Sequence, residues 1–230
     1  EYLKKILTIF IYCYNFMSKK LILIRHGESL WNLKNIYTGW ANPPLTNLGI
    51  KQAFTSGKLL FENNIIPDIT FTSSQKRSID TNLVILKTLG IYDNTIRIES
   101  WRLNERHYGK LTGLNKDKIK WKGEYFDVPP VINNKFDLNI LINDSYNPRF
   151  GESYYMTYLR LIPIWEFIIP FIKNNCNPII CSHKNTIKSL MLHIESLNKD
   201  EINNIEVPNA SPIVYYFDDN LNFVSKKILV

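Results

Sequence analysis

One short stretch indicates both the fold and the chemistry of this chain: Leu21-Ile22-Leu23-Ile24-Arg25-His26-Gly27-Glu28-Ser29. Four consecutive aliphatic residues predict a buried strand. Such a strand delivers Arg25 and His26 to its carboxyl end, the edge at which open α/β sheets bind ligands. We expect Gly27 to let the backbone approach a ligand closely, and Ser29 to cap a helix whose N-terminus attracts phosphate. A nucleophilic imidazole beside a guanidinium suits phosphoryl transfer through a phosphohistidine.

Strand-like and helix-like segments alternate along the rest of the chain. The patterns predict strands at residues 68–72, 96–99, 177–182, 213–217 and 224–230. They predict helices from Thr46 towards Phe61, at 76–89, at 153–173 with interruptions at Pro163 and Pro170, and at 185–195. In the helix at 76–89, the apolar face is Ile79, Leu83, Leu86 and Leu89. This alternation predicts a three-layer α/β fold, a mainly parallel sheet with helices on both faces.

Length and composition indicate one ordinary globular domain. The chain has 230 residues, 45% of them hydrophobic and 21% charged. We expect residues 1–16 to be an N-terminal extension outside the fold, ahead of a natural start at Met17, and residues 17–230 to form a single domain. The apolar run at 6–14 is too short for a membrane span, so no membrane partner is expected.

Charge and cysteine usage narrow the partners and the compartment. The net charge is +7, but the lysines are scattered, without the dense basic block of a nucleic-acid surface. We therefore expect a small anionic substrate and no nucleic acid. The three cysteines have no disulfide-like or metal-like spacing, which indicates a reducing, cytoplasmic compartment. No metal-binding motif occurs, so no metal is expected.

A second strand-turn-helix unit resembles the first. Residues 178–181 form an apolar run that ends at Ser182-His183, ahead of a helix. Two histidines on equivalent turns of one sheet indicate a catalytic pair rather than two isolated structural residues. Arg77 follows another predicted strand and could supply a second, bidentate guanidinium to a phosphate. Glu105, among many cations, is either an ion-pair partner or the general acid/base for a hydroxyl that gains or loses phosphate.

Three motifs carry a resemblance to a known family. Arg25-His26-Gly27-Glu28-Ser29-x-Trp31-Asn32 and Tyr37-Thr38-Gly39-Trp40 resemble the histidine phosphatase superfamily. The segment Trp101-Arg102-Leu103-Asn104-Glu105-Arg106-His107-Tyr108-Gly109-x-Leu111-Thr112-Gly113-Leu114-Asn115-Lys116 resembles the 2,3-bisphosphoglycerate-dependent phosphoglycerate mutases. Residues 207–215 are also similar to that family. The resemblance implies a phosphoglycerate mutase-like catalytic domain that interconverts 3-phosphoglycerate and 2-phosphoglycerate in glycolysis and gluconeogenesis.

The resemblance also implies a role for each matching residue. His26 is the phosphorylated nucleophile, Glu105 the proton donor and acceptor, and the transferring phosphoryl group is held with His183 by Arg25, Asn32 and Arg77. The substrate site is lined by Ser29, Thr38 and Gly39, with Arg106, Tyr108, Lys116 and Asn185 near the substrate's other groups. From the same resemblance we expect 2,3-bisphosphoglycerate as the priming phosphate donor, a phosphoglycerate as the partner, and a homodimer or a homotetramer as the assembly.

Three departures from the family pattern keep other activities open. The family's arginine pair after a tryptophan is replaced by Trp121-Lys122-Gly123, in which Lys122 keeps one charge for the substrate. Lys184 stands where the family has glycine, and so implies either a strained loop or an added cation in the pocket. The chain ends at Val230, so we expect no C-terminal lid to exclude water. The alternatives are a phosphatase acting on small phosphate monoesters and a catalytically weakened anion-binding relative.

Overall fold

A six-stranded sheet forms the centre of the computed structural model, which describes residues 19–121, 123–130 and 151–230. The strand order is β3-β2-β4-β1-β5-β6. The bounds are β1 Lys19–Arg25, β2 Ile69–Thr72, β3 Ile96–Glu99, β4 Pro178–Ser182, β5 Ile213–Phe217 and β6 Phe223–Ile228. The first four strands pair in parallel, whereas β5 and β6 are antiparallel. The expectation for residues 1–16 falls outside the described residues.

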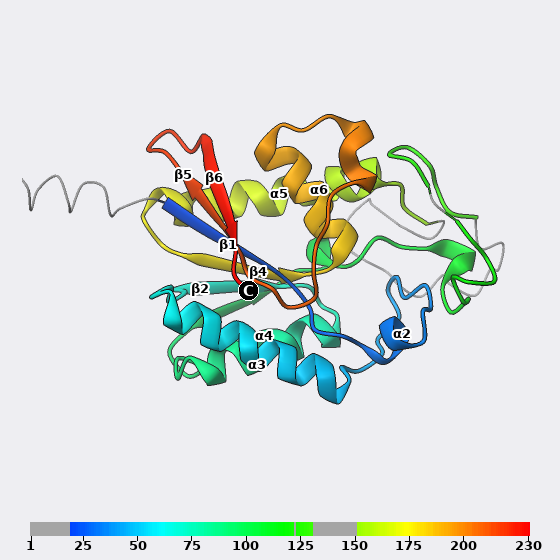
Figure 1. Ribbon diagram of the computed structural model, residues 1–230. Helices are drawn as coiled ribbons and strands as arrows, with labels where there is room; N and C mark the ends of the chain where they lie inside the picture. The colour runs from blue at the N-terminus through cyan, green and yellow to red at the C-terminus, as the bar shows by residue number, and fades with distance from the viewer. Residues whose placement is uncertain (1–18, 122, 131–150) are drawn as a thin grey trace, which may run out of the picture.

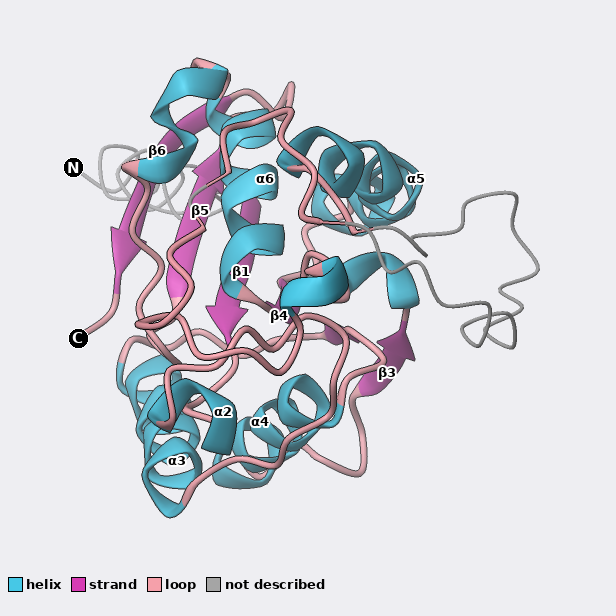
Figure 2. Cartoon of the chain, turned by 90° about the vertical axis from the view of Figure 1, so that its right-hand side faces the viewer, coloured by secondary structure: helices cyan, strands magenta, loops and turns pink. Residues whose placement is uncertain are grey.

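Helices cover both faces of this sheet, as the sequence predicts (Figure 1). One face carries α3 (Asn47–Glu62) and α4 (Lys76–Thr88), and the opposite face carries α5 (Tyr154–Lys173) and α6 (Lys184–Glu195) (Figure 2). Shorter elements are α2 (Leu30–Leu33) and the 3-10 helices η1 (Trp101–Leu103), η2 (Gly109–Leu111) and η4 (Lys199–Asn203).

The side chains of β1 show why an unbroken aliphatic run suits this position. Leu21 and Leu23 pack with residues of α5 and α6, whereas Ile22 and Ile24 pack with residues of α3 and α4. Successive side chains of a strand point to opposite faces. A central strand between two helical layers therefore needs an apolar side chain at every position.

The prediction of which α4 residues are buried is wrong in part. Leu86 is fully buried, but the other three predicted residues are only half-buried. The buried face instead contains polar residues: Ser78 Oγ donates to the Cys181 carbonyl at 2.5 Å, and Asn82 Nδ2 donates to Thr70 Oγ1 at 3.1 Å. Short polar side chains let α4 lie close to the sheet while their hydrogen bonds offset desolvation. Hydropathy alone misses such a face.

The interruptions predicted in α5 are absent, because the helix continues through Pro163 and Pro170. A proline inside a helix removes one hydrogen bond and disfavours the helix by about 3 kcal/mol. Burial offsets this loss, since Leu161, Ile164 and Ile168 lie in the main core. Among the described residues, α5 is the one helix long and apolar enough to cross a membrane, but these contacts make it a core helix of the fold.

Gly27 packs closely against a helix. A Cβ atom at this position would lie 2.3 Å from the carbonyl oxygen of Gly49 in α3. Gly27 therefore lets the turn after β1 contact the first turn of α3, and its close approach to a ligand stays a prediction. Ser29 caps a helix as predicted, in a capping box with Asn32, but α2 is only four residues long.

Candidate active site

The register of the sheet brings the two histidines together. Arg25 at the end of β1 pairs with Ser182 at the end of β4, so His26 and His183 follow two neighbouring parallel strands. Their ring centroids lie 5.0 Å apart, and both side chains are buried. The neighbouring strand β2 leads to Ser73, whose Oγ lies 2.7 Å from His183 Nε2. Three parallel strands thus deliver this cluster to one edge of the sheet.

Contacts of the His26 ring identify its reactive nitrogen. Nδ1 lies 2.6 Å from the Gly27 carbonyl, an acceptor, so this nitrogen carries the proton. Arg77 Nε donates to Nε2 at 3.2 Å, which requires a lone pair on Nε2. Burial, Arg77 and Arg25 lower the pKa of His26 well below 6.5. The ring is therefore neutral near pH 7, as a nitrogen nucleophile must be.

Two guanidiniums flank His26, and the backbone holds each of them. Arg77 donates to the carbonyls of Ala41 at 2.8 Å and Gly39 at 3.0 Å. Arg25 donates to the Val207 carbonyl at 3.0 Å. Burial lowers the pKa of Arg77 to about 10, and this group stays charged near neutrality. Fixed cations of this kind suit the developing charge on a transferring phosphoryl group.

Glu105 is buried beside the same cavity, with its carboxylate held by backbone amides. Its Oε1 accepts hydrogen bonds from the amides of Arg106 at 2.8 Å and Asn185 at 3.2 Å. Gln75 connects it to the neighbouring loop, because Gln75 Oε1 accepts from the Glu105 amide and Gln75 Nε2 donates to the Gly39 carbonyl, both at 2.8 Å. The sequence analysis does not identify Gln75.

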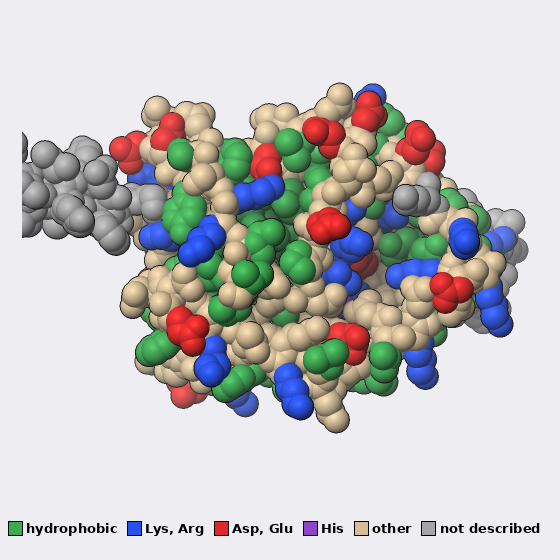
Figure 3. Space-filling view, in the orientation of Figure 1, with side chains coloured by type: hydrophobic (Ala, Val, Ile, Leu, Met, Phe, Trp, Pro, Cys, Tyr) green, Lys and Arg blue, Asp and Glu red, His purple; other side chains and the backbone are tan. Residues whose placement is uncertain are grey.

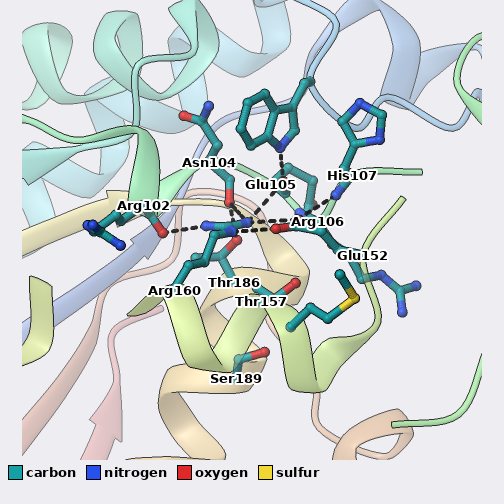
Figure 4. Close-up of polar contacts among 12 residues, drawn as sticks. Arg102, Asn104, Glu105, Arg106, His107, Glu152, Thr157, Arg160, Thr186 and Ser189 are labelled. Carbon is teal, nitrogen blue, oxygen red and sulfur yellow. Dashed lines mark hydrogen bonds and ion pairs between the residues drawn. The ribbon is translucent and has the colours of Figure 1, made fainter. Parts of the chain in front are cut away.

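A buried ion pair fixes the segment that carries Glu105 (Figure 4). Arg160 of α5 contacts Glu152 at 2.7 Å, and both side chains are fully buried. Arg160 also donates to the carbonyls of Arg102, Asn104 and Glu105, which anchors three backbone positions of this segment. Glu152 in turn accepts from the His107 amide at 2.8 Å. The sequence analysis does not identify this pair, because residues 152 and 160 reach the segment only through the tertiary fold.

These groups surround a cavity of about 250 Å³. Within the described parts of the chain, six cationic side chains and one carboxylate line it. The cations are Arg25, Arg77, Arg106, Lys116, Lys184 and Lys188, and the carboxylate is Glu105. Figure 3 shows lysine and arginine side chains gathered beside a hollow in this face of the molecule. Such a small, positively charged cavity suits a small polyanion.

Most of the predicted site residues line this cavity: Arg25, His26, Asn32, Thr38, Arg77, Glu105, Arg106, Tyr108, Lys116 and Asn185. Ser29, Gly39 and His183 are not among the lining residues. The Ser29 hydroxyl caps α2, the Gly39 carbonyl accepts from Arg77, and His183 contacts Ser73. Lys122 lies outside the described residues. The lining also includes Tyr37, Trp121, Gly123, Tyr154, Lys188 and Asn203, none of which the sequence analysis assigns to the site.

The two expectations for Lys184 have different outcomes. Lys184 is the first residue of α6 and is not among the residues with positive φ, so it causes no strained turn. It lines the cavity, as the other expectation requires. Burial and the charge of Arg25 lower the pKa of Lys184. Lys184 thus adds a cation to the lining of the cavity.

Comparison with known proteins identifies the class of this protein. The family model for the histidine phosphatase superfamily (branch 1) matches residues 21–227. The protein from Hydrogenobaculum sp. is 38% identical over 91% of both chains. Those from Lactococcus lactis subsp. cremoris and Blochmanniella floridana are each 40% identical over 88% of this chain and 94% of theirs. All three are named 2,3-bisphosphoglycerate-dependent phosphoglycerate mutase. The chain belongs to that family, which confirms the resemblance seen in the sequence.

Solved structures support the same fold. A mycobacterial glucosyl-3-phosphoglycerate phosphatase aligns with a TM-score of 0.71 at 17% identity, over 93% of this chain and 98% of that one. A putative alpha-ribazole-5'-P phosphatase from Escherichia coli aligns with a TM-score of 0.71 at 19% identity, over 92% of this chain and 96% of that one. At these identities the likeness concerns the three-layer α/β architecture alone.

Proposed function

We propose that this enzyme interconverts 3-phosphoglycerate and 2-phosphoglycerate through a phosphohistidine at His26. The observation that carries the proposal is the neutral His26 ring, whose Nε2 contacts Arg77 in a cavity that also holds Glu105. This arrangement combines a nucleophile, a fixed cation and a proton-transferring carboxylate. The enzyme family of the close relatives supports the same reaction.

In the first half-reaction, the substrate hydroxyl attacks the phosphorus atom on phosphorylated His26. The new O–P bond forms as the N–P bond breaks, and Glu105 takes the hydroxyl proton. The product is bound 2,3-bisphosphoglycerate. In the second half-reaction, His26 Nε2 attacks the other phosphoryl group, and Glu105 returns its proton to the leaving oxygen. Arg25, Arg77 and Asn32 hold the transferring group.

The net charge of the cavity matches the charge of the proposed substrate. The cavity has an excess of five positive charges among the described residues. A bisphosphoglycerate carries a carboxylate and two phosphates of about −1.5 to −2 each, so its charge is about −4 to −5. The cavity therefore matches both the bisphosphorylated intermediate and a phosphoenzyme with bound monophosphoglycerate. The same match supports 2,3-bisphosphoglycerate as the priming donor.

The remaining parts of the proposal concern the setting of the enzyme. We assign it to the cytoplasm, as a glycolytic and gluconeogenic isomerase, from the reducing pattern of its cysteines and from its relatives. His183 holds the transferring phosphoryl group together with Arg25, Arg77 and Asn32, and Lys122 adds a charge for the substrate. The family makes a homodimer or a homotetramer the expected assembly.

One assay separates this function from its alternatives. The purified chain is primed with 2,3-bisphosphoglycerate and given 3-phosphoglycerate, and 2-phosphoglycerate and free phosphate are both measured. We expect 2-phosphoglycerate to form faster than phosphate is released. Dominant phosphate release would identify a phosphatase instead. No turnover and no acid-labile phosphoprotein would identify an anion-binding relative.

A further inference from the structure

Tyr154 is a cavity residue that contacts two other parts of the site. It is the first residue of α5, is 4% exposed and lines the cavity. Its ring lies 4.0 Å from the guanidinium carbon of Arg106. Its hydroxyl donates to Asn185 Oδ1 at 2.7 Å. One side chain thus connects α5, the segment after Glu105 and the first turn of α6.

The contact with Arg106 belongs to an aromatic cage. The Arg106 guanidinium carbon also lies 4.9 Å from the Trp121 ring centroid and 5.1 Å from that of Tyr108. Arg106 is 3% exposed, and its Nε and Nη1 atoms have no hydrogen-bond partner among the described residues. Aromatic faces partly replace the lost hydration of this cation, but they leave the donors on Nε and Nη1 unused. A buried guanidinium with unused donors in a cavity is prepared for an anionic ligand.

The contact with Asn185 fixes the orientation of a second cavity group. Because Oδ1 accepts from Tyr154, the amide nitrogen of Asn185 points to Tyr108, and donates to its hydroxyl at 2.7 Å. The backbone amide of Asn185 donates to Glu105 Oε1. Burial raises the pKa of Tyr154 to about 12, so its hydroxyl remains a donor at every working pH.

Arg77 and Arg106 have different neighbours in the cavity, and these neighbours distinguish its His26 end from its Arg106 end. Arg77 contacts His26, whereas the rings around Arg106 are those of Tyr108, Trp121 and Tyr154. We propose that Tyr154 is a positioning residue that holds Arg106 and Asn185 against the anionic group of the substrate that is not being transferred. This inference rests on the proposed mutase function, because only a substrate with two anionic groups occupies both ends.

The test compares a ligand that fills one end of the cavity with ligands that fill both. Tyr154→Leu keeps most of the apolar packing but removes the ring and the hydroxyl, whereas Tyr154→Phe removes the hydroxyl alone. Tyr155→Leu is the matched control. Tyr155 is the next residue of α5, is 39% exposed, does not line the cavity, and packs with tilted rings against Tyr125 and Phe126. The measurements are kcat, the KM for 3-phosphoglycerate, the inhibition constant of inorganic phosphate and the Kd of 2,3-bisphosphoglycerate.

We expect Tyr154→Leu to raise the KM and the Kd of 2,3-bisphosphoglycerate about tenfold or more, the effect of losing a desolvated cation–π contact. Tyr154→Phe should raise both about fivefold, through loss of one hydrogen bond. The inhibition constant of inorganic phosphate should change less than about twofold, since phosphate binds only at the His26 end of the cavity. Tyr155→Leu should leave all four measured constants close to those of the parent chain.

Two results would overturn this assignment. One is an unchanged Kd of 2,3-bisphosphoglycerate in both Tyr154 variants. The other is an equal rise in the Kd of 2,3-bisphosphoglycerate and in the phosphate constant, which marks a general structural defect. If Tyr154→Leu fails to fold, Tyr154→Phe decides alone. Failure of the mutase function is distinguishable, because it would appear as absent 2-phosphoglycerate formation in the parent chain, while the Kd comparison would still test Tyr154.

Discussion

Replacing Glu152 with glutamine tests the buried ion pair that supports the catalytic segment. The change is nearly isosteric, but it leaves the fully buried Arg160 cation without its counter-ion. It also introduces an NH₂ group towards either Arg160 Nε or the His107 amide, both of which are donors. Removing one partner of a buried pair destabilises by about 3–5 kcal/mol. For a domain of this size, we expect Tm to fall by about 6–20 °C.

A surface ion pair supplies the control for this variant. Lys76 and Asp80 lie 3.2 Å apart in α4, with side chains 60% and 30% exposed. Asp80→Asn should change the free energy of unfolding by only about 0–1 kcal/mol, because water screens exposed pairs. Both variants are measured by urea unfolding with the same spectroscopic probe. The difference between them isolates the effect of burying the charge.

The activity of Glu152→Gln adds a second measurement. Below its Tm, the variant should show a lower kcat. Without the Glu152 carboxylate, the Arg160 guanidinium is no longer fixed in place, and its hydrogen bond to the Glu105 carbonyl therefore positions Glu105 less firmly. A free energy of unfolding within 1 kcal/mol of the parent, on the order of a surface pair, would refute this reasoning. It would show that the three backbone carbonyls alone stabilise the Arg160 guanidinium.

Three further predictions concern the cavity. We expect His26→Ala to abolish formation of an acid-labile phosphoenzyme from labelled 2,3-bisphosphoglycerate; label that persists would show that another group is the nucleophile. The unfolded chain protonates His26 and His183 below about pH 6.5, whereas the folded chain does not, since burial and Arg77 lower both pKa values. The free energy of unfolding should therefore fall as the pH drops from about 6.5 to 5, by up to about 1.4 kcal/mol per pH unit for each histidine. Urea titrations at several pH values check this, and a constant free energy over that range would contradict it. Finally, Lys184→Met should raise the KM for 3-phosphoglycerate by a few-fold, most strongly at low salt, while the exposed control Lys110→Met should not. Equal KM values for the two variants would exclude a contribution of Lys184 to binding.

Much of the fold is predictable because its signals are local. The aliphatic run of β1 predicts a central strand, and Thr46 caps α3 as expected, with its hydroxyl accepting from the Gly49 amide. The family resemblance is equally local, since it rests on short motifs. The predictions that were wrong concern α4 and α5. In both helices, packing against the sheet decides which face is buried and whether a proline is tolerated.

Some residues of the site could likewise be predicted from the sequence, whereas others could not. His26 and Glu105 could be predicted from the motifs that contain them, and Arg77 from its place after a predicted strand; all three line the cavity. Tyr154 could not, because it lies at the start of an apolar helix and 48 positions from Arg106, and only the packing of α5 brings the two together. The choice between the two expectations for Lys184 also required the backbone conformation, which shows that Lys184 is a helical residue and does not form a strained turn.

The strand that ends in Arg25 and His26, the order of strands and helices, and the family are all predictable without coordinates. Each of these depends on residues that are neighbours in the chain. Three other features require the folded structure: which nitrogen of His26 is free, how Arg160 anchors the Glu105 segment, and which rings surround Arg106. These features depend on contacts between segments far apart in sequence. Burial gives such contacts their strength, because a desolvated charge or hydrogen bond has no water to replace its partner.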